Sequence, residues 1–278
     1  PTPYRVWVSE IMLQQTRVEA VKPYFERFVA ALPDVRALAR ADEDTLMKLW
    51  EGLGYYSRAR HLQSAARLIC SDHGGKIPAR FDDLLTLPGI GRYTAGAVAS
   101  IAFGERRPAV DGNVLRVIMR LLACPADILK ESTKRAVEEA LIARLPENAG
   151  DFNQALMELG ALVCLPRGAA RCPSCPLERL CLAKEANLQA ELPQKTPPKR
   201  RRTEKLTIFL LSKNGKIALK KRPSQGLLAG LWGFPAMEGH LKKNEAAKTL
   251  QTLGLIPAKL HALPAAQHIF SHITWQMV

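Results

Sequence analysis

Glu10, near the start of the chain, is a carboxyl group placed where it could act as an acid. Helical periodicity is predicted for PYRVWVSEIMLQQTRVEA, residues 3–20, and it puts apolar side chains one turn before and one turn after Glu10. Apolar surroundings disfavour the ionised form of a carboxyl and raise its pKa, which makes a glutamic acid a proton donor near neutral pH. The alternative is an exposed glutamate on an amphipathic helix, paired with Arg5 or Arg17.

A second carboxyl, Asp111, stands at the start of the helical pattern AVDGNVLRVIMRLL. An aspartate in this position caps a helix by accepting hydrogen bonds from the amides two or three residues on, here those of Asn113 and Val114. The residues alone predict a cap.

A sharp turn interrupts the helical run at LPGIGRYTAGAVAS, residues 87–100. Pro88 ends the preceding helix, and we expect Gly89 and Gly91 to adopt backbone conformations closed to other residues. Free amides at the start of the next helix favour an anion, so the turn is a candidate phosphate-binding element. The alternative is a plain helical corner.

Four of the six cysteines lie close together, and they could hold a metal centre. They are Cys164, Cys172, Cys175 and Cys181. Four thiolates in so short a span suit either a zinc ion or an iron–sulfur cubane, and their spacing does not choose between them. A disulfide is not expected, because no export signal is visible.

The chain must fold around these groups as a globular protein. Of its 278 residues 47% are hydrophobic and 24% charged, and no apolar run reaches the roughly 20 residues that cross a bilayer. The net charge of +14 favours a polyanionic partner, above all nucleic acid, although a generally basic surface would give the same count.

Two domains are predicted. Helical spacing prevails to about residue 186, and a basic, proline-rich linker, PQKTPPKRRRTEK, follows at residues 193–205. Beyond it, KLTIFLLS and KIALKKR flank Asn214-Gly215, a pair that suits the type I′ turn of a β-hairpin. An all-α domain therefore precedes a β-containing domain, and the predicted fold class is α+β multidomain.

Several motifs in order resemble the MutY family of adenine DNA glycosylases, within the helix-hairpin-helix glycosylase superfamily. They are SEIMLQQT, GLGYYSRAR, LPGIGRYTAG, VDGNV and the cysteine cluster, and they run from Pro3 to about Ala186. The resemblance implies a helix-hairpin-helix part (residues 1–107), an iron–sulfur part (108–190), a linker (191–205) and an incomplete Nudix-like α/β domain (206–278). It also implies that the chain is truncated at both ends.

The resemblance assigns roles to the carboxyl groups. Glu10 would protonate adenine, Asp111 would stabilise the sugar cation, and Asn113 would help to position the acid and water. Tyr93 stands where related endonuclease III enzymes have a lysine that forms an imine with the sugar. A tyrosine cannot form that imine, so we expect a monofunctional glycosylase.

The same resemblance implies contacts to a flipped-out base and to the DNA backbone. Wedge residues would be Gln15, Thr16, Leu53 and Tyr55, although Leu53 and Tyr55 would also pass as core residues. The hairpin around Leu87, Gly89 and Gly91 would bind a phosphate and a monovalent cation, and Arg167, Arg171 and Arg179 would contact phosphates.

Two further expectations come from the family. Its usual ligand set is a [4Fe-4S] cluster, held here by the four cysteines, with seven residues between Cys164 and Cys172 where six are common. Its Nudix-like domain reads 8-oxoguanine through a Phe-Ser-His loop, which Phe270, Ser271 and His272 match. The carboxylate pairs of a Nudix hydrolase are absent from KNEAAKTLQTLGL, residues 243–255, so nucleotide hydrolysis is not expected.

The function expected from the sequence is base-excision repair of adenine opposite 8-oxoguanine or guanine. The partner would be duplex DNA and not a membrane, and the protein would be a bacterial, nucleoid-associated cytoplasmic monomer. Two alternatives are an endonuclease III-like lyase acting on oxidised pyrimidines and a non-catalytic helix-hairpin-helix DNA-binding protein.

Overall fold

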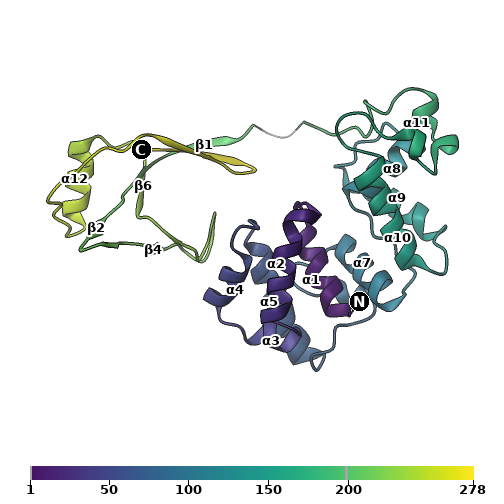
Figure 1. Ribbon diagram of the computed structural model, residues 1–278, viewed down its shortest axis with the longest axis horizontal. Helices are drawn as coiled ribbons and strands as arrows, with labels where there is room; N and C mark the ends of the chain where they lie inside the picture. The colour runs from purple at the N-terminus through teal and green to yellow at the C-terminus, as the bar shows by residue number, and fades with distance from the viewer. Residues whose placement is uncertain (1, 198–199) are drawn as a thin grey trace. The chain divides into compact units, whose positions relative to one another are not determined.

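The computed structural model describes residues 2–197 and 200–278 (Figure 1). Contacts divide the chain into two units, Pro1–Thr196 and Pro197–Val278, and each is described by itself. Within the predicted linker, residues 193–205, Pro198 and Lys199 lie outside the described residues, and the predicted end of the linker is wrong, because a strand begins at Arg202.

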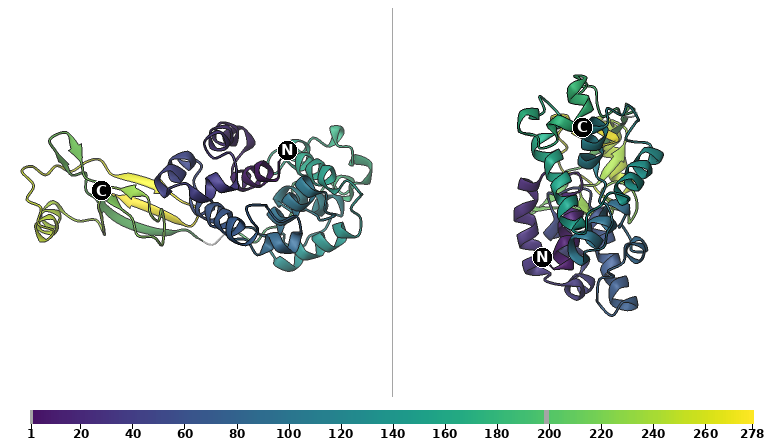
Figure 2. Two further views of the ribbon diagram at one scale, coloured as in Figure 1. Left: turned by 90° about the horizontal axis from the view of Figure 1, so that it is seen from below. Right: turned by 90° about the vertical axis from the view of Figure 1, so that its right-hand side faces the viewer.

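The first unit is helical throughout its described residues, as Figures 1 and 2 show. Its α-helices are α1 (Pro3–Leu13), α2 (Val18–Ala31), α3 (Val35–Arg40), α4 (Glu43–Trp50), α5 (Ser57–Asp72), α6 (Phe81–Leu85), α7 (Arg92–Phe103), α8 (Gly112–Leu121), α9 (Glu131–Ile142), α10 (Ala149–Glu158) and α11 (Leu182–Glu185). A π-helical turn, Leu159–Val163, extends α10, and two 3₁₀ turns, Cys172–Ser174 and Glu178–Leu180, precede α11.

Helix α1 is central to the first unit. It packs against α2, α5 and α7, and its side chains Trp7, Val8 and Met12 are almost fully buried. A second apolar cluster joins α8, α9 and α10 and includes Leu115 and Val137. Glu10 lies on α1 and Asp111 at the start of α8, and α7, which contacts both α1 and α10, connects these two regions.

The predicted helix over residues 3–20 is wrong in one respect, because it is two helices. Helix α1 ends at Leu13 and α2 begins at Val18, with Gln15 between them at φ 58°. Carbonyl groups at the end of α1 accept hydrogen bonds from the guanidinium of Arg58, which comes from a distant part of the sequence. Those carbonyls therefore do not continue the helix.

The helix–turn–helix of LPGIGRYTAG is present, but only one of the two glycines in its turn needs to be glycine for its backbone conformation. Gly89 has φ 76°, in the left-handed region, as predicted. Gly91 caps α7 with φ −91° and ψ 176°, which any residue adopts, so the prediction for Gly91 was wrong. Gly96, inside α7, meets the carbonyl of Pro108 so closely that a Cβ there would lie 2.1 Å from its oxygen.

The second unit is built on a four-stranded sheet of order β6-β1-β8-β7, together with a helix (Figure 2). Its elements are β1 (Arg202–Ile208), β2 (Ser212–Lys213), β3 (Lys216–Ile217), β4 (Lys220–Lys221), β5 (Trp232–Gly233), β6 (Ala236–Glu238), α12 (Lys243–Thr252), β7 (Ala266–Ile269) and β8 (Ile273–Met277). Strand β1 runs parallel to β8 and antiparallel to β6.

The predicted Asn-Gly hairpin is confirmed. β2 and β3 pair antiparallel across Asn214 and Gly215, whose φ angles of 52° and 73° are those of a type I′ turn. The stretch KLTIFLLS is not one strand, however, since β1 ends at Ile208 and β2 begins at Ser212. The fold class is nevertheless the predicted one, an α+β chain with a helical unit followed by a sheet-containing unit.

In the described parts of both units, no helix has the length and apolar character that crossing a bilayer requires.

Candidate active site

Glu10 is a buried acid, with 8% of its surface exposed. The hydroxyl of Tyr93 on α7 donates a hydrogen bond to its Oε2 over 2.5 Å, and the same hydroxyl lies 3.3 Å from Sδ of Met157. Burial raises the pKa of Glu10, the hydrogen bond from Tyr93 lowers it, and the charge of Asp111 raises it, with a net rise. Glu10 is therefore not the exposed, arginine-paired glutamate of the alternative interpretation.

Asp111 caps α8 as predicted. Its Oδ1 accepts hydrogen bonds from the amides of Asn113 and Val114, both at 2.8 Å. The side-chain amide of Asn113 donates to the other oxygen, Oδ2, at 2.7 Å. Burial raises the pKa of Asp111, and although these three hydrogen bonds and the charge of Arg116 lower it, the net change is a rise.

The two carboxyl groups share one electrostatic environment. The charge of Asp111 acts on the pKa of both Glu10 and Tyr93, so the three groups lie near one another. Asp111 accepts three hydrogen bonds and Glu10 one, and hydrogen bonds to a carboxylate favour its charged form. These contacts stabilise a charge on Asp111 with more hydrogen bonds than they provide for a charge on Glu10. Tyr93 stays protonated, because burial and the two nearby carboxylates raise its pKa.

Buried arginines on α8 connect this site to the cysteine loop. Arg116 donates from Nη2 to Oδ1 of Asn113 at 2.8 Å and to the carbonyl of Gly160 at 2.6 Å, and from Nε to the carbonyl of Cys164 at 2.7 Å. One turn on, Arg120 donates to Sγ of Cys164 at 3.3 Å. The position of Asn113, and through it Asp111, is thus tied to the first cysteine.

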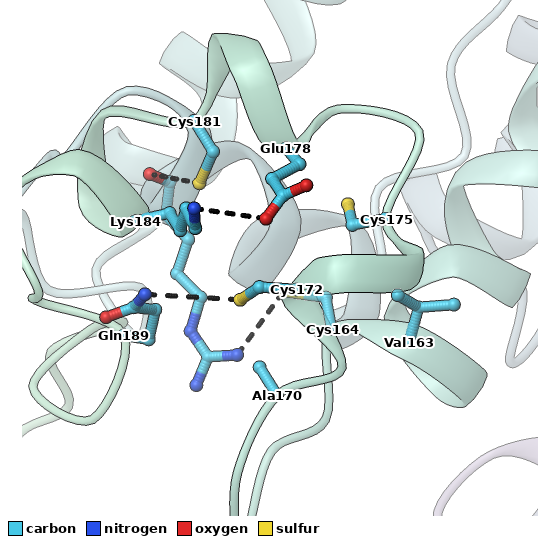
Figure 3. A pocket seen from close by; sticks show the side chains of 10 residues that line it. Val163, Cys164, Ala170, Cys172, Cys175, Glu178, Cys181, Lys184 and Gln189 are labelled. Atoms are coloured by element: carbon cyan, nitrogen blue, oxygen red, sulfur yellow. Dashed lines mark hydrogen bonds and ion pairs between the residues drawn. The ribbon is translucent and has the colours of Figure 1, made fainter.

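All four clustered cysteines line a single cavity at the end of the first unit (Figure 3). The side-chain amide of Gln189 points at Cys172, and an ion pair of 3.0 Å between Lys184 and Glu178 lies across the cavity (Figure 3). Within residues 2–197 and 200–278, no three His, Cys, Asp or Glu side chains are grouped so that they could hold a metal ion. The four thiols therefore share a cavity without converging on one point.

The hairpin predicted to grip phosphate is exposed where a ligand would approach. Gly89 and Gly91 are exposed, and a Cβ at Gly91 would meet nothing within 4 Å. No side chain caps the amides at the start of α7. Leu87, in contrast, is 2% exposed and belongs to the core.

The predicted wedge residues lie on two neighbouring turns. Gln15 and Thr16 are on the turn between α1 and α2, and Leu53 and Tyr55 are on the loop between α4 and α5. Gln15 is exposed and Tyr55 is 46% exposed, whereas Leu53 is 7% exposed and packs in the core. The guanidinium of Arg58 bonds to both turns.

The Phe-Ser-His residues form the loop between β7 and β8 in the second unit. Ser271 and His272 are exposed, while the ring of Phe270 stacks edge-on between His268, at 4.4 Å, and Trp275, at 4.9 Å. The loop thus exposes two polar side chains next to a cluster of packed aromatic rings.

Comparison with known proteins shows which families the chain resembles. Residues 8–143 match the model of the HhH-GPD superfamily of base excision DNA repair proteins, and residues 207–278 match that of the NUDIX domain. The chain is 38% identical to human adenine DNA glycosylase over 97% of its own length and 59% of the relative's. It is 33% identical to adenine DNA glycosylase of Buchnera aphidicola subsp. Schizaphis graminum, over 100% of this chain and 79% of the relative.

The chain belongs to the adenine DNA glycosylase family. A solved endonuclease III–DNA complex superimposes on it with a TM-score of 0.60 at 26% identity, covering 68% of this chain and 87% of that one. The predicted family and fold are confirmed. The chain spans about three fifths of the length of the human relative.

In this adenine DNA glycosylase family member, sequence reasoning missed the buried polar residues that hold the site together. They are Arg58, Arg116, Arg120 and Asn153. One signal was available, because Arg116 and Arg120 are four residues apart within the apolar run VLRVIMRLL and so share a helix face. Arg58 and Asn153 gave no comparable signal, since single polar residues in a helix are usually exposed.

Proposed function

We propose that this chain is a monofunctional base-excision-repair glycosylase that hydrolyses the N-glycosidic bond of adenine mispaired with 8-oxoguanine or guanine in duplex DNA. The observation that carries the proposal is the buried Glu10, hydrogen-bonded to Tyr93 and electrostatically coupled to Asp111. Membership of the adenine DNA glycosylase family supports the same substrate base.

The chemistry needs two carboxyl groups in different protonation states. Glu10, with its raised pKa, donates its proton to the departing adenine, which leaves as a neutral base. The anomeric carbon then carries positive charge, and Asp111, held by Asn113, stabilises it until water adds and gives a proton back to the Glu10 carboxylate. Tyr93 cannot form an imine with the sugar, so the DNA strand is not cut by the route that a lysine would open.

Adenine must leave the helix before this chemistry can begin. Unstacking and unpairing a base costs about a few kcal/mol, which contacts to the DNA must offset. Gln15, Thr16 and Tyr55 fill the gap left by the base, whereas Leu53, which is buried in the core, does not take the predicted wedge role. The amides of the hairpin at Gly89 and Gly91 bind a backbone phosphate, and carbonyls of the hairpin, including that of Leu87, hold a monovalent cation.

The second unit reads the opposite base. Phe270, Ser271 and His272 are proposed to recognise 8-oxoguanine, with the two exposed polar side chains facing the lesion. Nucleotide hydrolysis is not part of the proposal, because α12 lacks the carboxylate pairs that would hold magnesium.

The cofactor we propose is a [4Fe-4S] cluster bound by Cys164, Cys172, Cys175 and Cys181. Zinc would need all four sulfurs within about 2.3 Å of one ion, whereas a cubane offers each thiolate its own iron. All four thiols line one cavity, and the resemblance to the MutY family favours the cubane. When bound, it would fix the loop that Arg116 connects to Asn113.

Iron and acid-labile sulfide analysis of the purified chain tests the cofactor. We expect about four of each per chain, with a broad absorption band in the visible that Cys172→Ser diminishes. One zinc per chain and no sulfide would contradict the assignment.

The biological setting follows from the proposed substrate. A repair enzyme for chromosomal DNA acts where the chromosome lies, so we propose a monomer at the nucleoid in the bacterial cytoplasm, a setting that the Buchnera relative supports.

Single-turnover assays on a duplex with one adenine opposite 8-oxoguanine test the activity. We expect adenine release by the unsubstituted chain, a loss of at least about 100-fold in Glu10→Gln because general acid catalysis contributes that much, and an unchanged rate in the exposed control Glu19→Gln. Borohydride trapping on a duplex carrying an oxidised pyrimidine tests the lyase alternative. A trapped covalent adduct without adenine release would replace the proposal by that alternative, and DNA binding without either reaction would leave a binding protein.

A further inference from the structure

Arg58, on the first turn of α5, bonds to an unusual number of backbone carbonyls. Its side chain is 9% exposed. Nη1 donates to the carbonyls of Ile11, Met12 and Gln14, at 2.9, 3.0 and 2.6 Å. Nη2 reaches the carbonyls of Leu53 and Gly54, at 3.2 and 3.3 Å, and Oγ1 of Thr16 at 3.5 Å. One guanidinium therefore holds two segments that lie about 40 residues apart in the sequence.

Both segments contain backbone conformations that side chains disfavour. Gln15 has φ 58° and Tyr55 has φ 47°, and Gly54 beside it has φ 68°. A non-glycine residue in the left-handed region costs of order 1–3 kcal/mol and persists only where its surroundings fix it. The two strained side chains are also exposed, so no core packing accounts for their conformation.

The burial of Arg58 is itself costly. Among residues 2–197 and 200–278, its hydrogen-bond acceptors are carbonyl and hydroxyl oxygens and not carboxylates, and its Nε lacks a partner. The rings of Trp50 and Tyr55 lie under the guanidinium, at 5.4 and 5.6 Å. A buried positive charge that contacts carbonyl and hydroxyl groups and aromatic rings, but no carboxylate, adds little to the stability of the fold. We therefore expect Arg58 to serve in shaping the two turns.

We infer that Arg58 is a positioning residue that locks the turn at Gln14–Arg17 and the loop at Glu51–Tyr56 into one rigid wedge, so that Gln15 and Tyr55 enter the DNA together. The inference rests on the proposed function, in which these turns hold the base out of the helix. Arg58 touches neither the adenine nor the sugar. Its loss weakens base extrusion and leaves the chemistry at Glu10 and Asp111 in place.

Lysine cannot reproduce this arrangement. Its single ammonium group has three donors at one point, whereas the guanidinium reaches both segments at once from two nitrogens. Arg58→Lys keeps the charge and much of the buried stem. Arg67→Lys is the matched control, because Arg67 lies on the same helix and donates to the carbonyl of Ala39, on helix α3, outside the wedge.

The first measurement reports base extrusion without catalysis. A duplex carries 2-aminopurine in place of the target adenine, opposite 8-oxoguanine, and this base fluoresces more strongly when it is unstacked. We expect the full chain and Arg67→Lys to raise the fluorescence at saturating protein and Arg58→Lys to lose most of the rise. An undiminished rise with Arg58→Lys, or no rise with the unsubstituted chain, overturns the inference.

The second measurement separates positioning from general loss of structure. Single-turnover rates are compared for adenine opposite 8-oxoguanine and for the same adenine opposite an abasic analogue, where the base is already unpaired and extrusion costs less. Relative to the unsubstituted chain, we expect Arg58→Lys to lose about tenfold or more on the first duplex and less than about threefold on the second. Equal losses on both duplexes overturn the inference.

A second variant covers the case in which Arg58→Lys does not fold. Gly54→Ala adds a Cβ that meets nothing within 4 Å but disfavours φ 68°, so it disturbs the carbonyl that accepts hydrogen bonds from Arg58 and from Nε1 of Trp50. The same unequal loss on the two duplexes is expected, and an equal loss counts against the inference. Absence of adenine release from both duplexes by the unsubstituted chain refutes the proposed function instead, and the fluorescence comparison then still decides the role of Arg58.

Discussion

At the scale of single residues, the two carboxyl groups differ by the hydrogen bonds they receive more than by their burial. Burial raises the pKa of both. Asp111 gains charge stabilisation from two backbone amides and from Asn113, whereas Glu10 receives only the hydroxyl of Tyr93. In the proposed mechanism, the division of roles between an acid at the base and a carboxylate at the sugar originates in the helix cap at α8.

Replacing Tyr93 by phenylalanine should change the pH dependence of adenine release. Its hydroxyl lowers the pKa of Glu10, so its removal raises that pKa further. The active form requires protonated Glu10 and is lost as pH rises through the pKa, so the alkaline limb of the single-turnover profile should move to higher pH. The acidic limb, set by ionisation of Asp111, should stay where it is.

Tyr4→Phe provides the control for this profile. It removes a buried hydroxyl on the same helix as Glu10, one that bonds to the carbonyl of Leu32 at 2.7 Å. We expect it to lower stability by about 1 kcal/mol without moving either limb. An alkaline limb that stays in place or moves to lower pH in Tyr93→Phe would show that Tyr93 does not tune Glu10.

At the scale of elements, the hairpin and α7 contain two glycines with different requirements. A Cβ at Gly96 would lie 2.1 Å from the carbonyl oxygen of Pro108, in the segment that leads to Asp111. Gly91 has ordinary dihedral angles and open space around it. Gly96 is therefore needed for close packing. Gly91 is not required by the packing, so its place in the turn leaves room for the proposed phosphate.

Alanine at each position should separate folding from DNA binding. Gly96→Ala should destabilise the protein by about 1–3 kcal/mol through overpacking, visible as a lower thermal midpoint. Gly91→Ala should leave the midpoint unchanged or raise it slightly, while weakening duplex binding because its methyl group occupies the approach of the phosphate. Full affinity of Gly91→Ala for duplex DNA would argue against phosphate binding at this turn.

The sequence predicted an element correctly where the element depends on residues close to it in the chain. The cap at Asp111, the type I′ turn at Asn214-Gly215 and the helical periodicity of the first unit each depend on neighbours within a few residues. The break after Leu13 was missed, because Arg58, whose guanidinium binds the carbonyls there, lies far along the sequence. Buried polar links such as Arg116 to Cys164 share this character, since nothing near Arg116 reveals which carbonyl it will meet.

At the scale of the whole molecule, the net charge of +14 gives a general attraction for DNA. The positions of the positive side chains determine which of them contribute to binding the DNA phosphates. Many surface cations are already paired, such as Lys22 with Glu19 at 2.7 Å and Lys48 with Glu51 at 2.6 Å. Paired, exposed cations have little net charge to offer a phosphate. The exposed arginines of the cysteine loop and its surroundings are better candidates for counterion release.

The salt dependence of binding should identify these arginines. Each phosphate contact contributes about 0.9 to the slope of log K against log salt, so a triple variant in which Arg167, Arg171 and Arg179 become glutamine should lower the slope by up to about 2.7. The matched variant replaces three lysines in short ion pairs, Lys22, Lys48 and Lys134, and removes the same formal charge. We expect its slope to change by much less. Equal changes of the salt slope in the two variants would mean that net charge alone governs affinity and that the cysteine loop makes no phosphate contacts of its own. A change of slope confined to the arginine variant would place DNA against the loop that Arg116 connects to Asp111.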